Sequence, residues 1–403
     1  MSFDDSKAVP VVWMGAQGIK DSFTVTLTDL CDKPTHMQWI NSLEPHSQVR
    51  FDYKFIKAYS AQLDSAALEA VRKSPDVKNI RQNHYMVRPM VGNNDPNPQT
   101  DASWGLQRIT QRDPLPYGRR VDEHNYTFAL PPLVNPNPVN VYVIDSGVYI
   151  HHHDFENRAS FGSLFEVDED DKIGHGTIVA GIIAGKRWGV AKHARIIALK
   201  DHEEDPQSPA ARINPRNFEE DKRPESDWIV ASVDWAREDY ERKGVASILH
   251  LSLGGQHDEE LNEAVDLAVK AGMHVVVAAG NEMAIVDNQS PTSVDGVVVV
   301  GATDIRDYRP SWSNYGPKVT VYAPGEDVTS TWVTGPDDYT SAIGSSYAAP
   351  YATGVMAYIL GKEGNMPPAT LLKRIQSMAL EGVVGNLDDE NSGDLLNAAA
   401  LIV

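Results

Sequence analysis

Three polar side chains in the second part of the chain carry the groups needed to activate an oxygen nucleophile. Asp145 follows a hydrophobic run in VYVIDSG, His175 lies between glycines in GHGTIVAG, and a serine pair opens GSSYAAPYATG, residues 344–354. In such a set the acid orients the imidazole, and the imidazole takes the proton of the hydroxyl. Each residue alone could equally cap a turn or a helix. The hypothesis of nucleophilic catalysis therefore depends on their joint presence.

The elements around these residues predict how they are brought together. Short, nearly continuous apolar runs predict strands that are buried on both faces. We expect strands over 139–144, 194–199, 246–253, 273–279 and 296–302, and helices over 175–185, 226–244 and 258–272. This alternation predicts an α/β domain with a parallel sheet covered by helices on both faces. Sites in such sheets lie beyond the carboxyl ends of the strands.

The first part of the chain has a different pattern. Strand periodicity over 21–29, 51–61 and 77–87 alternates with helical periodicity over 36–43 and 64–74. We interpret the order as strand, helix, strand, strand, helix, strand, which is the ferredoxin-like α+β arrangement. Turn-forming residues in VGNNDPNP, residues 91–98, predict an exposed linker. The expected domains are therefore 1–98, with a folded core over 21–88, and 99–403.

Composition and charge are those of a soluble globular protein. The chain has 403 residues, of which 41% are hydrophobic and 23% are charged, and this length favours one large and one small domain. Basic and acidic residues balance over residues 1–98, so the net charge of −20 falls on residues 99–403. Such acidity argues against nucleic acid and anionic membrane as partners. The single cysteine, Cys31, excludes an intramolecular disulfide.

The order of the three residues along the sequence distinguishes between the folds that contain an acid, an imidazole and a hydroxyl in one site. Lipase-type hydrolases run Ser, Asp, His, whereas the order Asp, His, Ser is that of subtilisin. The blocks VIDSGVYIHHHDFENRA, GHGTIVAG, LHLSLGG, VVVAAGNE and GSSYAAPYATG resemble, in order, segments of the subtilases, closest to the proteinase K-like group. The resemblance covers nearly all of the chain from residue 100 onward, and residues 21–88 resemble the inhibitory propeptide of that family. A subtilisin-like fold is implied.

The resemblance implies a serine endopeptidase and gives each residue a role. It implies Ser346, rather than Ser345, as the nucleophile, His175 as the general base and acid, and Asp145 as the residue that holds the imidazole. It implies Asn281 as the side-chain donor of the oxyanion hole, together with the backbone N–H of Ser346. The residues implied for substrate binding are Ser252, Leu253, Gly254, Ala278, Ala279 and Gly280. Their small side chains favour broad specificity, with a preference for apolar or aromatic residues.

The resemblance also implies a self-processing zymogen. A propeptide of this family assists folding, places its tail in the cleft and is cut off by the enzyme itself. We expect the cut between Met90 and Pro98, because QTDASWGLQRI, residues 99–109, resembles a mature amino-terminal segment. The expected partners are protein or peptide substrates and the chain's own propeptide, in a monomer.

The location of the protein is left open by the sequence. The family favours secretion. No apolar run reaches the roughly 20 residues that span a bilayer, and VPVVWMGA near the start lacks the basic flank and the length of a leader. An intracellular or vacuolar enzyme is therefore also compatible with the sequence.

Some positions depart from the family pattern, and none of them removes a group of the set. Ile178 replaces a second histidine, and Tyr347 replaces a methionine. Thr320 stands where proteinase K-like relatives have an aspartate that contributes to a calcium site. A hydroxyl is a poor substitute for a carboxylate toward a hard cation, which argues against structural calcium at this position. No cofactor is expected for the chemistry, and no metal ligands are assigned.

Three further segments each have two interpretations. The acidic run 166–171 could bind a cation or form a solvated loop. The histidines 151–153 favour a surface turn over a metal site, because consecutive residues of an extended segment point to opposite faces. The charged loop 201–226 could narrow specificity or be an inert insertion.

Other classes of function are compatible with parts of the sequence. A catalytically inactive subtilase would act as a binding protein, but it would have to lack a group of the set, and all are present. A dinucleotide-binding enzyme would also have a parallel sheet, but no G-x-G-x-x-G follows the first strand. Residues 1–98 could also be a permanent inhibitor, which differs from a propeptide only in not being released.

Overall fold

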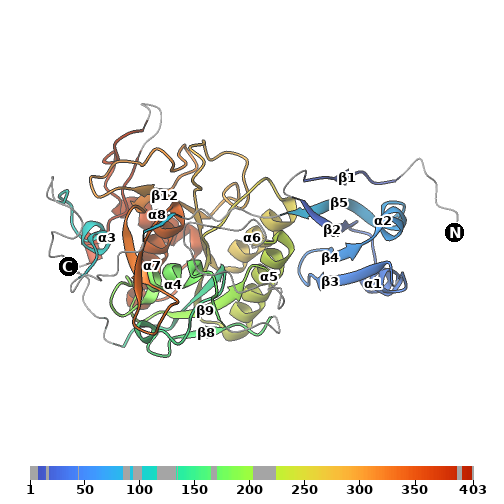
Figure 1. The fold of residues 1–403 in the computed structure, drawn as a ribbon, viewed down its shortest axis with the longest axis horizontal. Coiled ribbons are helices and arrows are strands. Elements are labelled where there is room, and N and C mark those ends of the chain that lie inside the picture. The colour runs from blue at the N-terminus through green and yellow to red at the C-terminus, as the bar shows by residue number, and fades with distance from the viewer. Residues whose placement is uncertain are drawn as a thin grey trace.

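In the computed structural model the chain forms a large α/β domain beside a small α+β domain (Figure 1). The structure describes residues 8–14, 18–43, 45–84, 91–93, 102–115, 133, 135–164, 170–202, 224–387 and 393–401. In these ranges, none of the helices combines the length and the apolar character that crossing a membrane requires.

The small domain has the predicted order of elements. Its sheet has the strand order β1-β5-β2-β4-β3, where β1 is a short additional strand. The strands are β1 (Val11–Val12), β2 (Gly18–Leu27), β3 (Ser47–Asp52), β4 (Ala58–Leu63) and β5 (Val77–His84), and the helices are α1 (Lys33–Asn41) and α2 (Ser65–Arg72). The prediction of one strand over 51–61 is wrong in detail. That apolar run spans the end of β3, a turn and the beginning of β4, which pair antiparallel.

The large domain contains the predicted parallel sheet. Its seven strands have the order β13-β12-β11-β10-β7-β9-β8, and all neighbouring pairs are parallel. The strands are β7 (Val139–Asp145), β8 (Ala159–Phe161), β9 (Arg195–Lys200), β10 (Ala246–Leu251), β11 (His274–Ala278), β12 (Val298–Thr303) and β13 (Val321–Pro324). Every run predicted as a strand in this domain overlaps one of them.

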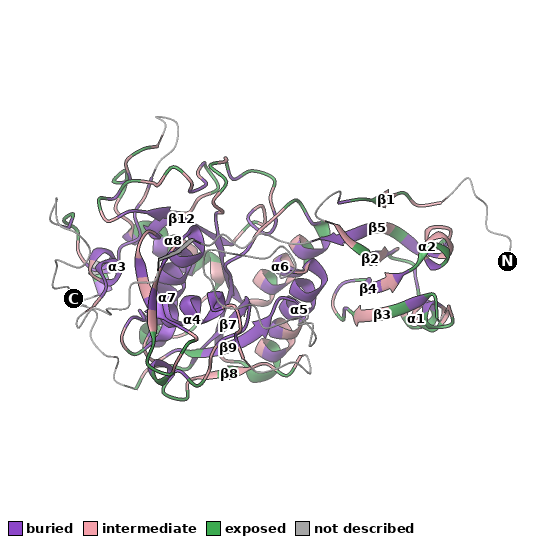
Figure 2. Cartoon of the chain, in the orientation of Figure 1, coloured by how far each residue is buried: buried purple, intermediate pink, exposed green. Residues whose placement is uncertain are grey.

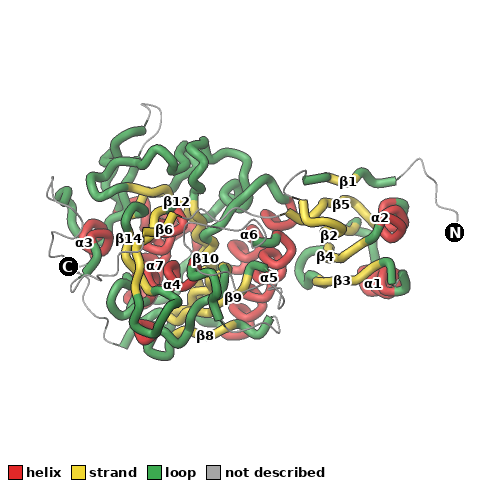
Figure 3. The backbone as a smooth tube through the Cα atoms, viewed as in Figure 1, coloured by secondary structure: helices red, strands yellow, loops and turns green. Residues whose placement is uncertain are grey.

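Helices cover both faces of the sheet, as Figures 1 and 3 show. The helices are α3 (Trp104–Ile109), α4 (His175–Ala184), α5 (Ser226–Lys243), α6 (Glu259–Ala271), α7 (Ser345–Glu363) and α8 (Pro368–Met378). Successive residues of β7 point to opposite faces: Val141 and Val143 join the core under α4 and α7, whereas Tyr142 and Ile144 join the core under α5 and α6. Both cores are buried (Figure 2), which explains why the strands are apolar throughout.

A third, smaller sheet joins the segment after the small domain to the large domain. It contains β14 (Val328–Thr331), β15 (Tyr339–Ile343) and β6 (Val91–Asn93), in the order β14-β15-β6 and with antiparallel pairing. The prediction of an exposed linker over 91–98 is therefore wrong for 91–93, whose backbone groups hydrogen-bond to β15. Residues 94–98 lie outside the described residues.

The small domain lies against α5 and α6 (Figure 1) and contacts them through ion pairs. The Arg50 guanidinium lies 2.9 Å from the Asp227 carboxylate and 3.0 Å from Glu225, and Arg81 lies 3.1 Å from Glu260. Three residues of the small domain, Tyr53, Ile56 and Ala58, pack into the apolar core under α5 and α6. The excess of acidic residues in the large domain thus includes the surface on which the small domain lies.

Candidate active site

Asp145, His175 and Ser346 come from three elements at the carboxyl edge of the parallel sheet. Asp145 ends β7, His175 begins α4, and Ser346 is the second residue of α7. The His175 ring lies 5.3 Å from the ring of Tyr347, the residue next to Ser346. The fold therefore brings together the acid, the imidazole and the hydroxyl that the sequence singled out.

The acid and the imidazole are already paired. His175 Nδ1 lies 2.7 Å from Oδ1 and 2.8 Å from Oδ2 of Asp145, and both side chains are buried. An N–H on Nδ1 facing the carboxylate leaves the proton acceptor of a neutral imidazole on Nε2. Nε2 is buried and has no hydrogen-bond partner among the described residues. Nε2 of His175 is therefore available to accept a proton.

The Ser346 hydroxyl donates its hydrogen bond elsewhere in this conformation. Its Oγ lies 3.1 Å from the carbonyl oxygen of Ser252. Catalytic hydrogen bonds are often absent without substrate and form in the complex. A rotation about the Cα–Cβ bond of Ser346 would turn its hydroxyl away from the Ser252 carbonyl and toward the imidazole of His175.

Close backbone approach fixes the beginning of α4 against the strand end that carries Asp145. A Cβ atom on Gly176 would lie 2.1 Å from the Gly147 carbonyl oxygen and 3.0 Å from the Asp145 Cβ. Only glycine fits this position without displacing the loop after β7. The Ser146 hydroxyl accepts a hydrogen bond from the Gly176 N–H at 3.0 Å, so the loop and the helix are tied together beside the histidine.

The last residue of the acidic run 166–171 holds the same helix. Asp171 is buried and accepts hydrogen bonds from the N–H groups of Ile173, Gly174 and Thr177 and from the Thr177 hydroxyl, at 2.7–3.0 Å. Burial raises the pKa of the Asp171 carboxyl. The interpretation of this run as a solvated loop is wrong for Asp171, which satisfies the free N–H groups of a helix beginning. Residues 166–169 lie outside the described residues.

Pro350 determines how the backbone of Ser346 is held. It is the sixth residue of α7, and a proline has no N–H to donate to the carbonyl four residues earlier, which is that of Ser346. The Ser252 hydroxyl donates to the Ser346 carbonyl oxygen instead, at 2.7 Å. The hydrogen bond that the helix lacks is thus supplied by the loop that follows β10.

His250 extends this hydrogen bond into a chain whose proton positions are determined. His250 Nε2 lies 2.7 Å from the Ser252 Oγ, and Nδ1 lies 2.7 Å from the Thr353 Oγ1. Since the one hydroxyl proton of Ser252 goes to Ser346, the Ser252 oxygen accepts from Nε2–H. Nδ1 then accepts from Thr353, one helical turn beyond Pro350. Burial lowers the pKa of His250 to about 3, so the ring is neutral.

This series of hydrogen bonds was not predicted from the sequence. The one indication of these hydrogen bonds in the sequence is the histidine inside the apolar run ASILHLSL, residues 246–253. A polar side chain at a buried strand position requires a partner. The identity of the partners, however, depends on the packing of α7 against β10, which the sequence does not show.

The predicted oxyanion residue, Asn281, contacts the residue before Ser346. The Ser345 N–H donates to Asn281 Oδ1 at 2.9 Å, which leaves the amide Nδ2 of Asn281 as the donor. The N–H of Ser346 lies in the first turn of α7, where backbone N–H groups have no helical acceptor. These two donors are of the kind that stabilises a developing negative oxygen.

Asn314 holds the Asn281 loop in place and was also missed by the sequence analysis. It is buried, its Oδ1 accepts from the N–H groups of Glu282 and Ala284, and its Nδ2 donates to the Ala279 carbonyl and to Glu282. Gly280 has φ +100°, and a Cβ atom there would lie 2.4 Å from the Asn314 amide. The glycine thus allows the supporting amide to reach the loop.

A pocket lies between the loops that follow β10 and β11. It includes five of the six residues predicted for substrate binding and has a cavity volume of about 170 Å³. Its lining residues are Leu253, Gly254, Gly255, Gln256, Ala278, Ala279, Gly280, Glu282, Gln289, Ser290 and Thr292. The sixth predicted residue, Ser252, contributes the carbonyl and hydroxyl contacts to Ser346. An apolar cavity of about 150 Å³ accommodates a benzene ring, so the pocket can receive an aromatic side chain.

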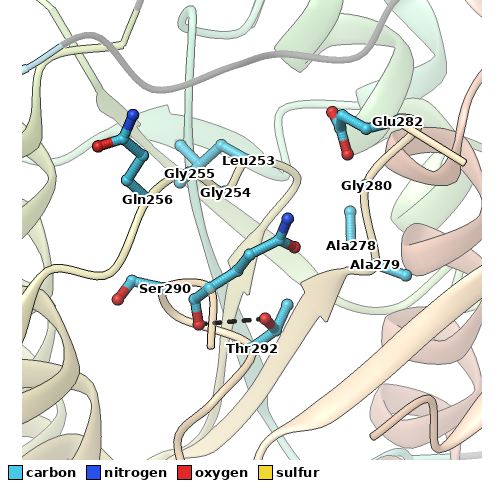
Figure 4. A pocket seen from close by; sticks show the side chains of 11 residues that line it. Leu253, Gly254, Gly255, Gln256, Ala278, Ala279, Gly280, Glu282, Ser290 and Thr292 are labelled. Carbon is cyan, nitrogen blue, oxygen red and sulfur yellow. Dashed lines mark hydrogen bonds between the residues drawn. The ribbon is translucent and has the colours of Figure 1, made fainter. Parts of the chain in front are cut away.

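Polar groups lie at the rim of this pocket. Figure 4 shows Gln256 and Glu282 on opposite sides of it. The Glu282 carboxylate is fixed by hydrogen bonds from the Asn281 N–H at 2.9 Å and the Asn314 amide at 2.7 Å. A rigid negative charge therefore stands beside a largely apolar pocket.

The segments considered for metal binding have other hydrogen-bond partners. The Thr320 hydroxyl accepts from the Val299 N–H at 3.0 Å, so it is committed to a neighbouring strand. His152 is buried, accepts from the Asp154 N–H and contacts the Asp338 carbonyl, whereas His151 and His153 are exposed, as expected for a turn. Most of the charged loop 201–226, residues 203–223, lies outside the described residues.

Comparison with known protein families gives two matches. The profile of the Subtilase family matches residues 137–396. The profile described as Peptidase inhibitor I9 matches residues 14–87. The two matches cover the large and the small domain, respectively.

Individual proteins give the same result. The chain is 33% identical to Subtilisin-like protease 3 of Pseudogymnoascus destructans, over 84% of this chain and 78% of that protein. It is 31% identical to Subtilisin-like protease 5 of Arthroderma gypseum, over 99% and 96%. A solved cold-adapted subtilisin-like serine proteinase is 31% identical, with a TM-score of 0.60 over 74% of this chain and 98% of that one. Fervidolysin from Fervidobacterium pennivorans, 21% identical with a TM-score of 0.69, shares the fold.

The hydrogen-bond chain behind Ser346 makes a stability prediction. We expect Thr353→Val to lower the free energy of unfolding by about 1–3 kcal/mol, because it leaves the buried Nδ1 of His250 without a donor. Urea denaturation measures this loss. Thr370→Val, at an exposed position of α8, is the matched control. An equal effect of both substitutions, or a ring-nitrogen NMR spectrum that places the His250 proton on Nδ1, would contradict the assignment.

Proposed function

The chain belongs to the subtilase family and is a subtilisin-like serine protease, and from this premise we propose that it is an endopeptidase that acts through Asp145, His175 and Ser346. The observation that carries the proposal is the buried Asp145–His175 pair, whose Nε2 lies open beside the helix that presents Ser346. The carboxylate on Nδ1 orients the ring so that Nε2 is the nitrogen available as a base.

The proposed reaction follows from the positions of these groups. Ser346 Oγ attacks the scissile carbonyl carbon while its proton passes to His175 Nε2, and Asp145 stabilises the resulting imidazolium. The negative oxygen of the tetrahedral intermediate accepts hydrogen bonds from Asn281 Nδ2 and the Ser346 N–H. The imidazolium then donates its proton to the leaving amine as the C–N bond breaks, which gives the acyl-enzyme. Water, deprotonated by His175, attacks the ester and releases the acid and the serine.

The chain of hydrogen bonds through Ser252 supports this role for Ser346. It fixes the backbone of the nucleophile at the turn where the helix loses a bond to Pro350. An oxyanion donor acts well when it costs no reorganisation during the reaction. Because the N–H that would serve as that donor belongs to Ser346 itself, the anchor on its carbonyl also orients the donor.

We infer broad specificity with two classes of preferred side chain before the scissile bond. The apolar floor formed by Leu253, Ala278 and Ala279 favours aromatic and large aliphatic side chains. The rim carboxylate of Glu282 adds an attraction for a lysine or arginine whose stem crosses the pocket and whose charge reaches the opening. The substrate itself would bind as an extended chain along the pocket loops.

We propose that residues 1–98 form an inhibitory propeptide that is removed by the enzyme, and that residues 99–403 form the catalytic domain. The I9 match supports intramolecular inhibition. The backbone pairing of β6 with β15, which leads directly into Gly344 and Ser346, supports a cut within the interval from Met90 to Pro98. In the intact chain Val91 pairs with Ile343, three residues before Ser346.

The first prediction concerns self-processing. Expressed from residues 1 to 403, the parent chain is expected to shorten with time to a catalytic fragment and a propeptide fragment, while Ser346→Ala keeps its full mass. Mass spectrometry of both chains measures this directly, and the fragment masses give the bond that is cut. A serine-directed phosphonate should label the parent at Ser346 only.

The variant Ser345→Ala distinguishes the roles of the two adjacent serines. It removes the hydrogen bond from the Gly280 N–H to the Ser345 hydroxyl but leaves the nucleophile, so shortening should persist at a lower rate. A parent chain that stays whole and does not react with the phosphonate would show that the protease proposal is wrong.

The second prediction concerns the rim of the pocket. We expect Glu282→Gln to lower kcat/KM about two- to fivefold for peptides with lysine or arginine before the cut, because an exposed charge pair contributes about 0.2–1 kcal/mol. Peptides with phenylalanine at that position should be unaffected. The loss should shrink as the salt concentration rises. Glu381→Gln, at an exposed position away from the pocket, is the control, and an equal change for both peptide classes would refute a specific role of Glu282.

His84 makes release of the propeptide dependent on pH. It is fully buried at the end of β5, its Nδ1 lies 3.8 Å from the Asp258 carboxylate, and neither ring nitrogen has a hydrogen-bond partner among the described residues. Burial lowers its pKa to about 4, and the charge of Arg81 acts in the same direction. Released histidine has a pKa of about 6.5. Between these values the released form binds a proton that the docked form excludes, so docking weakens as the pH falls.

The third prediction uses this difference. The processed complex should release its propeptide faster as the pH is lowered from about 6.5 toward 4, by up to tenfold per pH unit, and the onset of activity reports the release. Burial raises the pKa of Asp258 and Glu260, which opposes the effect. The quantity to compare is therefore the ratio between the parent and His84→Gln at each pH. A ratio that is constant with pH, or a similar ratio for the exposed His46→Gln, would exclude His84 as the sensor.

A further inference from the structure

A cluster of metal-ligating side chains lies in the small domain, away from the catalytic residues. Cys31 lies in the turn after β2, His36 lies on α1, and Asp76 lies in the turn before β5. One ligand atom from each of the three lies within 4.8 Å of the other two. Cys31 and His36 are buried, whereas the Asp76 side chain is 45% exposed. The cluster is thus closed on two sides and open to solvent on the third.

The spacing of these atoms is close to that of a tetrahedral metal site. The nitrogen and oxygen ligands of a zinc ion lie about 3.4 Å apart, and a thiolate lies about 3.6 Å from either, given zinc bond lengths of about 2.0–2.3 Å. His36 Nδ1 lies 3.2 Å from Asp76 Oδ2. The Cys31 sulfur, which lies on a turn, needs to move by at most about 1.2 Å from the widest spacing of 4.8 Å. Three protein ligands with a fourth position open to water are typical of zinc.

The surroundings of the histidine fit the same interpretation. His36 Nε2 lies 3.3 Å from the hydroxyl of Tyr59, which is buried in the core of the small domain. A metal-bound histidine characteristically pairs its second nitrogen with an outer partner that fixes the ring. With Nε2–H donated to Tyr59, Nδ1 keeps its lone pair directed at the space shared with Cys31 and Asp76.

Charge balance gives the cluster a reason to hold a cation. A divalent cation deprotonates a coordinating thiol outright. A thiolate, a carboxylate and a neutral imidazole around a divalent ion form a neutral set. The His36–Asp76 pair alone would need no ion. The Cys31 thiol beside this pair supplies the third ligand of a metal site.

We propose that Cys31, His36 and Asp76 bind one divalent cation of the zinc class. The ion would tie the turn after β2 to α1 and to the turn before β5, three segments that also meet through a small apolar core and through a hydrogen bond from the Thr28 N–H to the Asp76 carbonyl oxygen. Small domains gain much of their stability from such links. If the small domain is the propeptide proposed above, loss of the ion would weaken the inhibitor and hasten release, but the site itself does not depend on that role.

The test uses the full chain with Ser346→Ala, which stays whole whether or not the protease proposal holds. Co²⁺ replaces zinc in such sites, and a cobalt–thiolate bond absorbs in the near ultraviolet. Because Cys31 is the one cysteine of the chain, this band can come from no other residue. We expect it to saturate at one Co²⁺ per chain, to disappear in Cys31→Ala, and to need about 10–100-fold more metal in Asp76→Asn and His36→Gln.

A matched variant and a second measurement keep the test decisive. His46→Gln removes a histidine of the same domain that is paired with Asp64 at 2.6 Å but has no thiol beside it, and it should leave the titration unchanged. Zn²⁺ should raise the unfolding temperature of the parent but not of Cys31→Ala, which also shows that this variant folds. Absence of the cobalt–thiolate band in the parent, or a zinc-induced shift that survives in Cys31→Ala, would overturn the proposal. Neither result bears on self-processing, which is measured with Ser346 intact.

Discussion

The carbonyl oxygen of Ser346 lacks the helical hydrogen bond that Pro350 cannot donate, and the rest of the site depends on how that bond is replaced. The replacement runs from Thr353 through His250 and Ser252 back to Ser346. It joins the first and third turns of α7 to the central strand β10, so the helix cannot rotate without breaking these buried hydrogen bonds. A proline inside a helix usually weakens it. Here Pro350 leaves the carbonyl of Ser346, one turn earlier, to the hydrogen bond from Ser252, which fixes the orientation of Ser346.

The parallel sheet supplies the other constraint. Because all seven strands point the same way, the loops after β7, β10 and β11 emerge at one edge. These loops carry Asp145, the pocket residues from Leu253 onward, and Asn281. Asp171 and Ser146 accept hydrogen bonds from N–H groups in the first turn of α4, and Asn314 accepts one from the Glu282 N–H in the loop after β11. The positions of the reacting groups are thus set by rigid elements, and few of the supporting contacts involve exposed side chains.

The comparison of sequence and structure shows which of these features a sequence can reveal. The apolar runs predicted the strands because burial on both faces leaves little else at those positions, and the order Asp145, His175, Ser346 indicated the family. The roles of His250, Asn314 and Asp171 could not be predicted, because each depends on which segment packs against it. The single strand expected over 51–61 failed for a related reason: the turn between β3 and β4 is itself rich in apolar residues, Tyr53, Phe55 and Ile56, and has no glycine to mark it.

The contact between the two domains is polar in a way that suits a removable inhibitor. Arg50 and Arg81 lie in buried or largely buried ion pairs with Asp227, Glu225 and Glu260, at the beginnings of α5 and α6. Such pairs specify one orientation, but their desolvation offsets much of the attraction. Burial in the docked state raises the pKa of Asp227 and Glu260, and separation would return both carboxylates to water. The free energy recovered by hydrating these charges favours release, whereas an apolar contact of the same area would oppose it.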